Sequence, residues 1–182
     1  MNVVDKLTLG DKSFKRYISQ NQISEIVAQM ASEMNNFYKH KTVYILGVLN
    51  GAFIFTGDIC RKFDFQCEIS FLRANSYIGT QSSGSVRIEL DPRMSIAGKH
   101  VLVLEDIMET GKTANELLPL LKLLEPESLK FACLFYKEGH PNRIFEPDFI
   151  GRRIGNEFIV GYGLDYRGLG RNLQEVWILD ES

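Results

Sequence analysis

The chain has 182 residues, of which 45% are hydrophobic and 24% are charged, so it can bury a sizeable core and is not a disordered segment. Its formal net charge of -2 provides no overall basic field, which argues against extensive binding to the phosphate backbone of nucleic acid. Any phosphate site must therefore be local.

The sequence also bears on compartment. Residues 1–18 mix charged and apolar side chains and lack the apolar core of a signal peptide. The longest apolar stretch, at 43–55, is interrupted by Asn50 and is too short to span a bilayer. The three cysteines are widely spaced in apolar sequence, which is typical of core thiols in a reducing compartment. We expect a cytoplasmic protein with no membrane partner.

The first half of the chain alternates helix and strand. A helix is predicted from about Gln22 to Tyr38, because apolar residues recur there at helical spacing and Asn21 or Ser24 could cap its start. A β-rich strand at 43–49 then ends in a tight turn that leads into a helix over 52–63.

A third strand, at 67–74, leads into NSYIGTQSSGSVR at 75–87, a segment rich in Ser, Gly and Thr that we interpret as a mobile loop. A helix is predicted at 114–124, with a kink or an early end at Pro119 because proline removes a backbone donor. Further strands are predicted at 101–106, 129–136 and 157–166.

This alternation, with near-continuous apolar strands, argues for an α/β fold whose parallel sheet is covered by helices on both faces. No repeat, low-complexity tract or linker divides the chain, so we expect residues 1–182 to form a single domain.

The stretch VLVLEDIMETGKTANELL at 101–118 carries the clearest chemical signal. Ligands of open parallel sheets collect at the carboxyl ends of strands, so Glu105 and Asp106 should face the binding crevice. Residues 110–113 offer backbone N–H groups, two hydroxyls and an ammonium at a helix start, which favours a dianionic phosphate. A triphosphate-binding loop would need glycine at position 106. The two motifs together indicate a sugar phosphate.

At this point the sequence resembles a known family. VLVLEDIMETGKT is similar to the phosphoribosyl-pyrophosphate-binding motif of the type I phosphoribosyltransferases. Four further features resemble the hypoxanthine-guanine phosphoribosyltransferase family in order and spacing: LNGAF at 49–53, SYIGTQSSG at 76–84, Lys137 at a strand end, and FIVGYGLDYRGLGRNL at 158–173. The resemblance begins near residue 18. It implies a mainly parallel central sheet flanked by helices, with a small hood formed by terminal segments.

The resemblance implies a division of roles around the sugar. Glu105 and Asp106 would hold the ribose hydroxyls, and Glu109 would lie near purine N7 as the general base or proton acceptor. The 5'-phosphate would lie on Thr110, Gly111, Lys112 and Thr113.

For the purine, the resemblance implies that Lys137 hydrogen-bonds the 6-oxo group, Phe158 stacks on the ring and Ile159 presents backbone groups to its edge. Asp165 would lie near the base and bind Mg²⁺, and the metal set would also include Glu105 and Asp106. The cofactor implied is Mg²⁺.

For the leaving group, the resemblance implies a pyrophosphate loop, often with a non-proline cis peptide, and an arginine contact. These fall on Leu49, Asn50, Gly51 and Arg171. Ser76 and Tyr77, in the expected mobile loop, resemble the lid of the family.

The activity implied is purine salvage: Mg²⁺-dependent transfer of phosphoribosyl from 5-phosphoribosyl 1-pyrophosphate to N9 of hypoxanthine or guanine, giving IMP or GMP and pyrophosphate. The expected partners are the purine base and phosphoribosyl pyrophosphate, without nucleic acid. The resemblance also implies a homodimer or homotetramer. The preference among hypoxanthine, guanine and xanthine stays open.

Two positions depart from the family pattern, which usually has aspartate where this chain has Glu109 and frequently lysine where it has Asn50. Each site residue taken singly also has a structural interpretation, such as a helix-dipole role for Glu109 or a core role for Phe158. The alternative function is a regulatory phosphoribosyltransferase-like protein that binds nucleotide or RNA. The ordered motifs together favour the enzyme.

Overall fold

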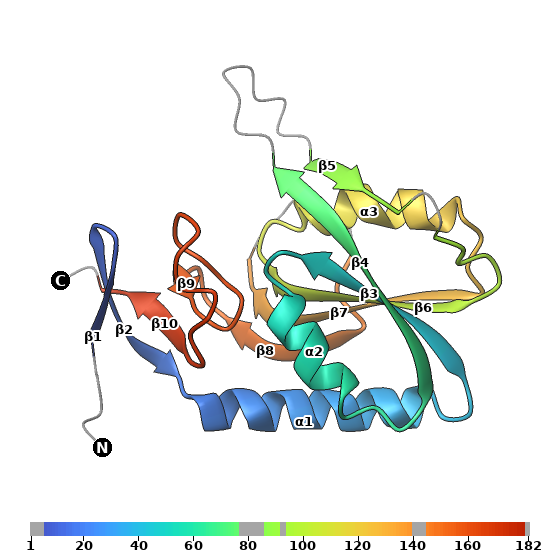
Figure 1. Cartoon of the computed structure of the whole chain (residues 1–182), viewed down its shortest axis with the longest axis horizontal. Helices are drawn as coiled ribbons and strands as arrows, with labels where there is room; N and C mark the ends of the chain where they lie inside the picture. The colour runs from blue at the N-terminus through green and yellow to red at the C-terminus, as the bar shows by residue number, and fades with distance from the viewer. Residues whose placement is uncertain (1–5, 77–85, 92–93, 140–144, 181–182) are drawn as a thin grey trace.

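A computed structural model describes residues 6–76, 86–91, 94–139 and 145–180. Its larger sheet has six strands in the order β5-β4-β3-β6-β7-β8 (Figure 1). Neighbouring strands run parallel except for the antiparallel pair β4 and β5. The strands are β3 (Thr42–Leu49), β4 (Gln66–Ser76), β5 (Val86–Glu89), β6 (His100–Met108), β7 (Ser128–Lys137) and β8 (Phe149–Ile154).

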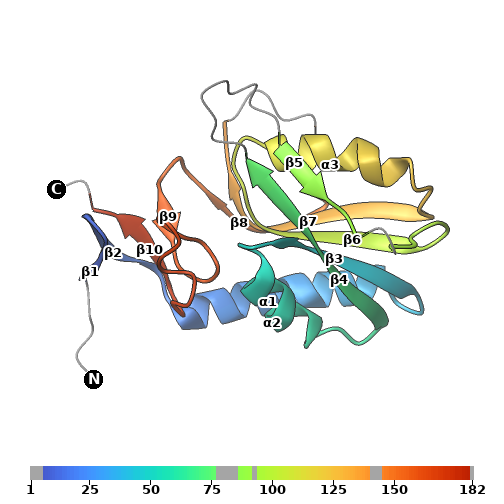
Figure 2. The same cartoon turned by 45° about the horizontal axis from the view of Figure 1, so that its top comes forward.

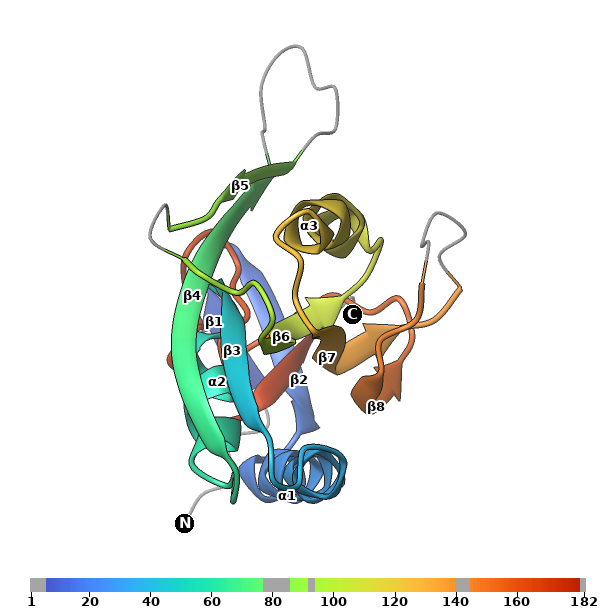
Figure 3. The same cartoon turned by 90° about the vertical axis from the view of Figure 1, so that its right-hand side faces the viewer.

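Helices cover both faces of this sheet, as Figure 3 shows, and explain why its strands are apolar on both sides. Helices α1 (Gln20–Phe37) and α2 (Phe53–Cys60) pack on one face, where Leu102 and Leu104 of β6 point. Helix α3 (Lys112–Lys122) packs on the other face, where Val101 and Val103 point. None of the described helices is long and apolar enough to cross a membrane.

The two ends of the chain build a second, four-stranded antiparallel sheet, which we call the hood. Its order is β1-β2-β10-β9, and Figure 2 shows it beside one end of the larger sheet. Phe14, Val160 and Trp177 form its small core. The hood and the mainly parallel sheet were expected and are confirmed. The hood strands are β1 (Lys6–Leu9), β2 (Lys12–Ile18), β9 (Ile159–Val160) and β10 (Val176–Leu179).

The predicted start and cap of the first helix were wrong. Helix α1 begins at Gln20, and its N-cap is Ser19 rather than Asn21 or Ser24. The N–H of Gln22 donates to Oγ of Ser19 at 3.3 Å, while the N–H of Ser19 donates to Oε1 of Gln22 at 2.9 Å. This reciprocal capping box satisfies backbone donors that neither predicted cap would reach.

The prediction of a strand across 157–166 was also wrong, because only Ile159–Val160 is strand. Gly161, Tyr162 and Gly163 follow with φ of 99°, 50° and 102°, and residues in that conformation cannot continue a ladder. Helix α3 runs through Pro119 and ends at Lys122, two residues before the predicted end.

The prediction of a loop across 75–87 was wrong at its ends, which belong to β4 and β5. Asn75 pairs with Arg87 and Ser76 pairs with Val86 in the antiparallel pair of these two strands, on either side of residues 77–85. Those residues, which include the predicted lid residue Tyr77, lie outside the described ranges.

Candidate active site

A cavity of about 280 Å³ lies between the carboxyl ends of the parallel strands and the hood. It is lined on one side by the carboxyl ends of β3, β4, β6 and β7, and on the other by residues in and around β9. A second hollow of about 310 Å³ adjoins it along residues 105–114. The first cavity brings together the predicted residues Leu49, Asn50, Gly51, Glu105, Asp106, Glu109, Thr113, Lys137, Phe158, Ile159, Asp165 and Arg171.

The adjoining hollow ends at the start of α3, where an anion is favoured. Gly111 is the N-cap with φ of 73° and provides no side-chain cap, while the N–H of Lys112 donates to Oγ1 of Thr110 at 3.3 Å. The first turn also contains no acidic residue. The predicted phosphate residues Thr110, Gly111, Lys112 and Thr113 therefore present a helix N-terminus, with a lysine beside it, to the hollow.

Two carboxylates meet where the cavity and the hollow join. Glu105 and Asp106 of β6 are 8% and 9% exposed, and Oε2 of Glu105 has no hydrogen-bond partner among the described residues. Burial, together with the nearby charge of Asp106, raises the pKa of Glu105 to about 8. Burial also raises the pKa of Asp106 to about 6, although backbone N–H groups oppose this. Oε2 of Glu105 thus lacks the polar partner that a buried carboxylate needs, while Asp106 has backbone partners only.

The predicted pyrophosphate loop lies against these carboxylates. The Leu49–Asn50 peptide is cis, as the family resemblance implied. A Cβ on Gly51 would lie 1.8 Å from Oδ2 of Asp106, so only glycine fits there. A Cβ on Gly163 would lie 2.0 Å from the carbonyl oxygen of Gly51. Glycine on both segments therefore lets the loop, β6 and the hood meet closely.

On the other side of the cavity, a lysine and an acid lie together. Lys137 ends β7, and its side chain is only 5% exposed. Its Nζ lies 3.1 Å from Oε2 of Glu109, whose side chain is half exposed. A long buried lysine at the end of a strand places one cationic donor beside one carboxylate in the cavity wall.

Phe158, just before β9, is 43% exposed although it is aromatic, and it lines the same cavity. Its ring centroid lies 6.4 Å from that of Phe14 in the hood core, so the ring is supported from one side. An exposed aromatic face beside a donor and an acceptor suits a flat heteroaromatic ring.

An ion pair in the loop after β9 closes the remaining side of the cavity. Nη2 of Arg171 lies 2.5 Å from Oδ1 of Asp165, and Nη1 donates to the carbonyl oxygen of Gly163 at 2.7 Å. The N–H of Gly168 donates to Oδ2 of Asp165 at 2.6 Å. Asp165 and Arg171 are thus held in one loop by each other and by its backbone.

The donor set fits a metal that arrives with an anionic ligand. Four carboxylates and two cations line the cavity, and one oxygen of Glu105 lacks a partner among the described residues. Within the described ranges, no group of three or more His, Cys, Asp or Glu side chains could hold a metal by itself. Mg²⁺ commonly binds through one or two carboxylates together with phosphate oxygens of a substrate.

Four lining residues were not predicted: Val48, Ala74, Ile107 and Leu164. Val48 and Ala74 lie near the carboxyl ends of β3 and β4, so the rule that located Glu105 could have found them. Of the two predicted lid residues, Ser76 is the last residue of β4.

Comparisons with known proteins agree with this geometry. The model of the phosphoribosyl transferase domain family matches residues 15–167. A hypoxanthine-guanine phosphoribosyltransferase of Aquifex aeolicus (strain VF5) is 36% identical over 173 residues, covering 93% of this chain and 97% of that protein. A hypoxanthine-guanine-xanthine phosphoribosyltransferase of Tritrichomonas foetus is 38% identical over 165 residues, covering 90% of each.

A solved structure shows that the similarity extends to the fold. A hypoxanthine phosphoribosyltransferase of Staphylococcus aureus matches with a TM-score of 0.86 at 33% identity, covering 99% of this chain and 96% of that one. The expected type I phosphoribosyltransferase fold, with its mainly parallel sheet and flanking helices, is confirmed.

The buried carboxylate of Glu105 predicts a pH-dependent stability. Its pKa is about 8 in the folded protein against 4.5 for an exposed glutamate, so between these pH values the unfolded chain binds fewer protons. The free energy of unfolding therefore falls as pH rises through this window. Without ligand, Glu105→Gln should exceed the wild type in this free energy at pH 8, by at least about 1.4 kcal/mol, and by less at pH 5.

Urea denaturation at both pH values measures this difference. The matched control is Glu116→Gln, because Glu116 is an exposed glutamate of α3 and should show no such pH dependence. An equal effect of Glu105→Gln at pH 5 and pH 8 would contradict the account of its burial.

Proposed function

Since this chain belongs to the phosphoribosyltransferase family, we propose that it transfers phosphoribosyl from phosphoribosyl pyrophosphate to N9 of hypoxanthine or guanine. One observation carries the proposal. The cavity with the exposed ring of Phe158 and the Lys137–Glu109 pair is continuous with a carboxylate pair and a helix N-terminus. A 6-oxopurine site thus adjoins a sugar-phosphate site.

The sugar and its phosphate fit the hollow along residues 105–114. Glu105 and Asp106 accept hydrogen bonds from the two ribose hydroxyls, which supply polar partners to buried oxygens that have few. The 5'-phosphate lies on the N-terminus of α3, held by backbone N–H groups and the hydroxyls of Thr110 and Thr113. The ribose is thereby held between two fixed ends.

The purine fits between Phe158 and the Lys137–Glu109 pair. The ammonium of Lys137 donates to the 6-oxo group, and the carboxylate of Glu109 accepts a proton at N7. N9 forms a bond to C1 of the ribose as the bond from C1 to pyrophosphate breaks, and pyrophosphate leaves with the electron pair. The proton lost by the purine goes to Glu109, so the reaction is balanced.

Mg²⁺, which we include in the proposal, would be held by Asp165, Glu105 and Asp106 together with substrate oxygens, and would neutralise charge on the leaving pyrophosphate. Arg171 contacts the pyrophosphate, for which it must share or exchange its pairing with Asp165. Backbone groups of Leu49, Asn50 and Gly51 complete this contact. In this loop Asn50 carries no charge, so its contribution is polar rather than ionic.

The sugar develops positive charge as its bond to pyrophosphate breaks, and water would attack it. Exclusion of water is therefore required, and Ser76 and Tyr77 are the residues that we assign to the lid. We further propose that residues 1–182 act as one catalytic domain, because the larger sheet and the hood each supply part of one site.

We also propose that the enzyme is cytoplasmic and assembles as a homodimer or homotetramer. Cys60, Cys67 and Cys133 form no disulfide with one another, which suits a reducing compartment. Ile69 and Phe71 on one side of β4 are 51% and 40% exposed, which favours contact with another copy.

Turnover of a panel of purine bases tests the function. Purified protein with Mg²⁺ and phosphoribosyl pyrophosphate should convert hypoxanthine, guanine or both to the nucleoside monophosphate, with xanthine included because one relative carries it in its name. The absence of turnover with all three bases would reject the proposal. Salt-dependent RNA binding without turnover would favour the regulatory alternative.

Variants of Glu109 test its assignment as proton acceptor. Glu109→Gln should lower kcat by about 10²- to 10⁴-fold with little change in KM for the base, because the amide cannot accept the proton. Glu109→Asp should keep activity within roughly tenfold of the wild type, because it retains the carboxylate.

The matched control is Glu138→Gln, because Glu138 follows Lys137 directly but is an exposed residue outside the cavity lining. Steady-state kinetics of the three variants and the wild type provide the comparison. Equal kcat in all four proteins would show that Glu109 has only a structural role.

A further inference from the structure

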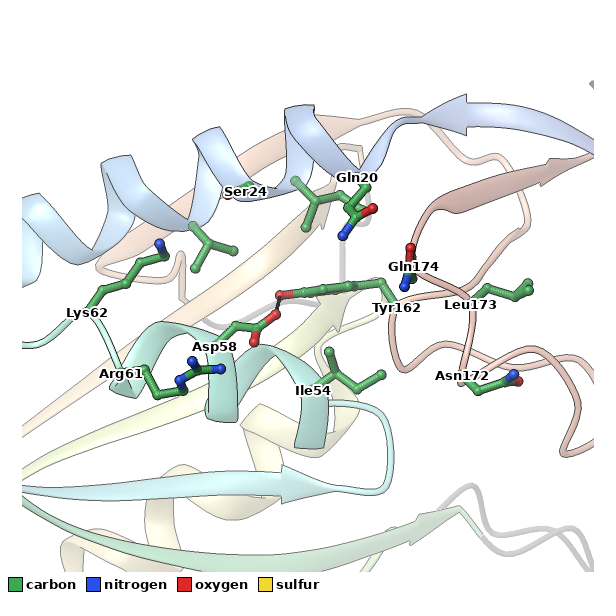
Figure 4. A pocket seen from close by; sticks show the side chains of 12 residues that line it. Gln20, Ser24, Ile54, Asp58, Arg61, Lys62, Tyr162, Asn172, Leu173 and Gln174 are labelled. Atoms are coloured by element: carbon green, nitrogen blue, oxygen red, sulfur yellow. Dashed lines mark hydrogen bonds between the residues drawn. The ribbon is translucent and has the colours of Figure 1, made fainter. Parts of the chain in front are cut away.

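A second pocket, of about 400 Å³, lies between α1, α2 and the loop that follows β9 (Figure 4). Its wall includes one polar contact between distant segments. The hydroxyl of Tyr162 donates to Oδ2 of Asp58 at 2.7 Å, across 104 positions of sequence. No step of the transfer described above uses either residue.

We propose that Tyr162 and Asp58 are positioning residues for the pyrophosphate end of the reaction, an inference that rests on the proposed function. Their hydrogen bond ties the loop that carries Asp165 and Arg171 to α2, the helix that directly follows the pyrophosphate loop. The hydrogen bond thereby fixes the two segments that contact the pyrophosphate relative to each other.

The position of Tyr162 in its loop is tightly constrained. Its backbone is left-handed, with φ of 50°, although bulky residues rarely adopt that conformation. Its side chain is nearly buried, at 6% exposure, and its N–H donates to the carbonyl oxygen of Leu173 at 2.9 Å. Burial and the nearby Asp58 raise the pKa of the Tyr162 phenol, so the hydroxyl stays a donor at neutral pH.

The next residue transmits this constraint to the site. The N–H of Gly163 donates to the carbonyl oxygen of Arg171 at 2.9 Å, and the carbonyl oxygen of Gly163 accepts from Nη1 of Arg171 at 2.7 Å. The backbone of Gly163 also lies against the carbonyl of Gly51, too close for any side chain. A shift at Tyr162 would therefore move both Arg171 and its contact with the pyrophosphate loop.

Asp58 supplies the fixed end of the tie. It lies in α2 five residues after the helix start, and Phe55 and Ile59 of the same helix are fully buried in the core. The acceptor is a carboxylate, and hydrogen bonds to ionised acceptors are stronger than neutral ones. The helix is thus the anchored partner, and the hydrogen bond holds the loop to it.

Tyr162→Phe tests the proposal because it removes only the hydroxyl. We expect KM for phosphoribosyl pyrophosphate to rise roughly three- to tenfold, as the loss of one hydrogen bond implies. KM for the purine should change less than about twofold, because neither Lys137 nor Phe158 takes part in the Tyr162–Asp58 hydrogen bond. Asp58→Leu should give the same pattern, and the double variant should be no worse than either single variant.

The matched control is Tyr166→Phe. The hydroxyl of Tyr166 also donates to an aspartate, Oδ1 of Asp11 at 2.8 Å, but this bond joins the same loop to the β1–β2 turn and not to α2. Its KM for phosphoribosyl pyrophosphate should equal that of the wild type. Measured melting temperatures separate a loss of folded protein from a loss of positioning.

Two results would overturn the proposal. One is an unchanged KM for phosphoribosyl pyrophosphate in both Tyr162→Phe and Asp58→Leu while the wild type is active. The other is an equal rise in KM for both substrates in Tyr162→Phe, or an equal rise in KM for phosphoribosyl pyrophosphate in Tyr166→Phe. A wild type without turnover would instead reject the proposed function, so the two failures are distinguishable.

Discussion

The burial of Glu105 and Asp106 at the end of β6 is the constraint on which the site depends. Buried carboxylates are costly unless hydrogen bonds or positive charge compensate them, and one oxygen of Glu105 has no partner among the described residues. The protein therefore places hydrogen-bond acceptors where the cavity and the hollow meet. A ligand can supply the donors that these acceptors lack. A sugar with vicinal hydroxyls, together with a divalent cation, provides such partners.

The larger sheet and the hood surround this acidic pair from two sides. The larger sheet presents it at the carboxyl ends of its strands, together with Lys137 and the start of α3. The hood adds Phe158 and the Asp165–Arg171 pair from the other side. Close approach of the two parts requires glycine at positions 51 and 163, where a Cβ would collide with Asp106 or with the backbone. The contact between the backbones of Gly51 and Gly163 therefore fixes how the hood sits on the larger sheet at the site.

Much of the central fold and of the site could be predicted from the sequence, because both depend on local patterns. The apolar run before Glu105 predicted a buried strand and the TGKT turn predicted a helix start, and β6 and α3 confirm both. The hood strands were missed because β1 and β2 carry charged residues, and because β10 is short and pairs with β2 at the other end of the chain. The tie between Tyr162 and Asp58 was equally invisible, since 104 positions separate them. Of the two departures from the family pattern, Glu109 lies 3.1 Å from Lys137 at the cavity wall, and Asn50 lines the same cavity.

Under the proposed function, one nucleotide spans the cavity and the adjoining hollow in a single orientation. A crystal structure of the protein with IMP or GMP and Mg²⁺ would test this orientation. We expect the phosphate at the start of α3, the ribose hydroxyls on Glu105 and Asp106, and the purine between Phe158 and Lys137. A nucleotide bound in the reverse orientation, or in the pocket beside Asp58, would contradict this expectation.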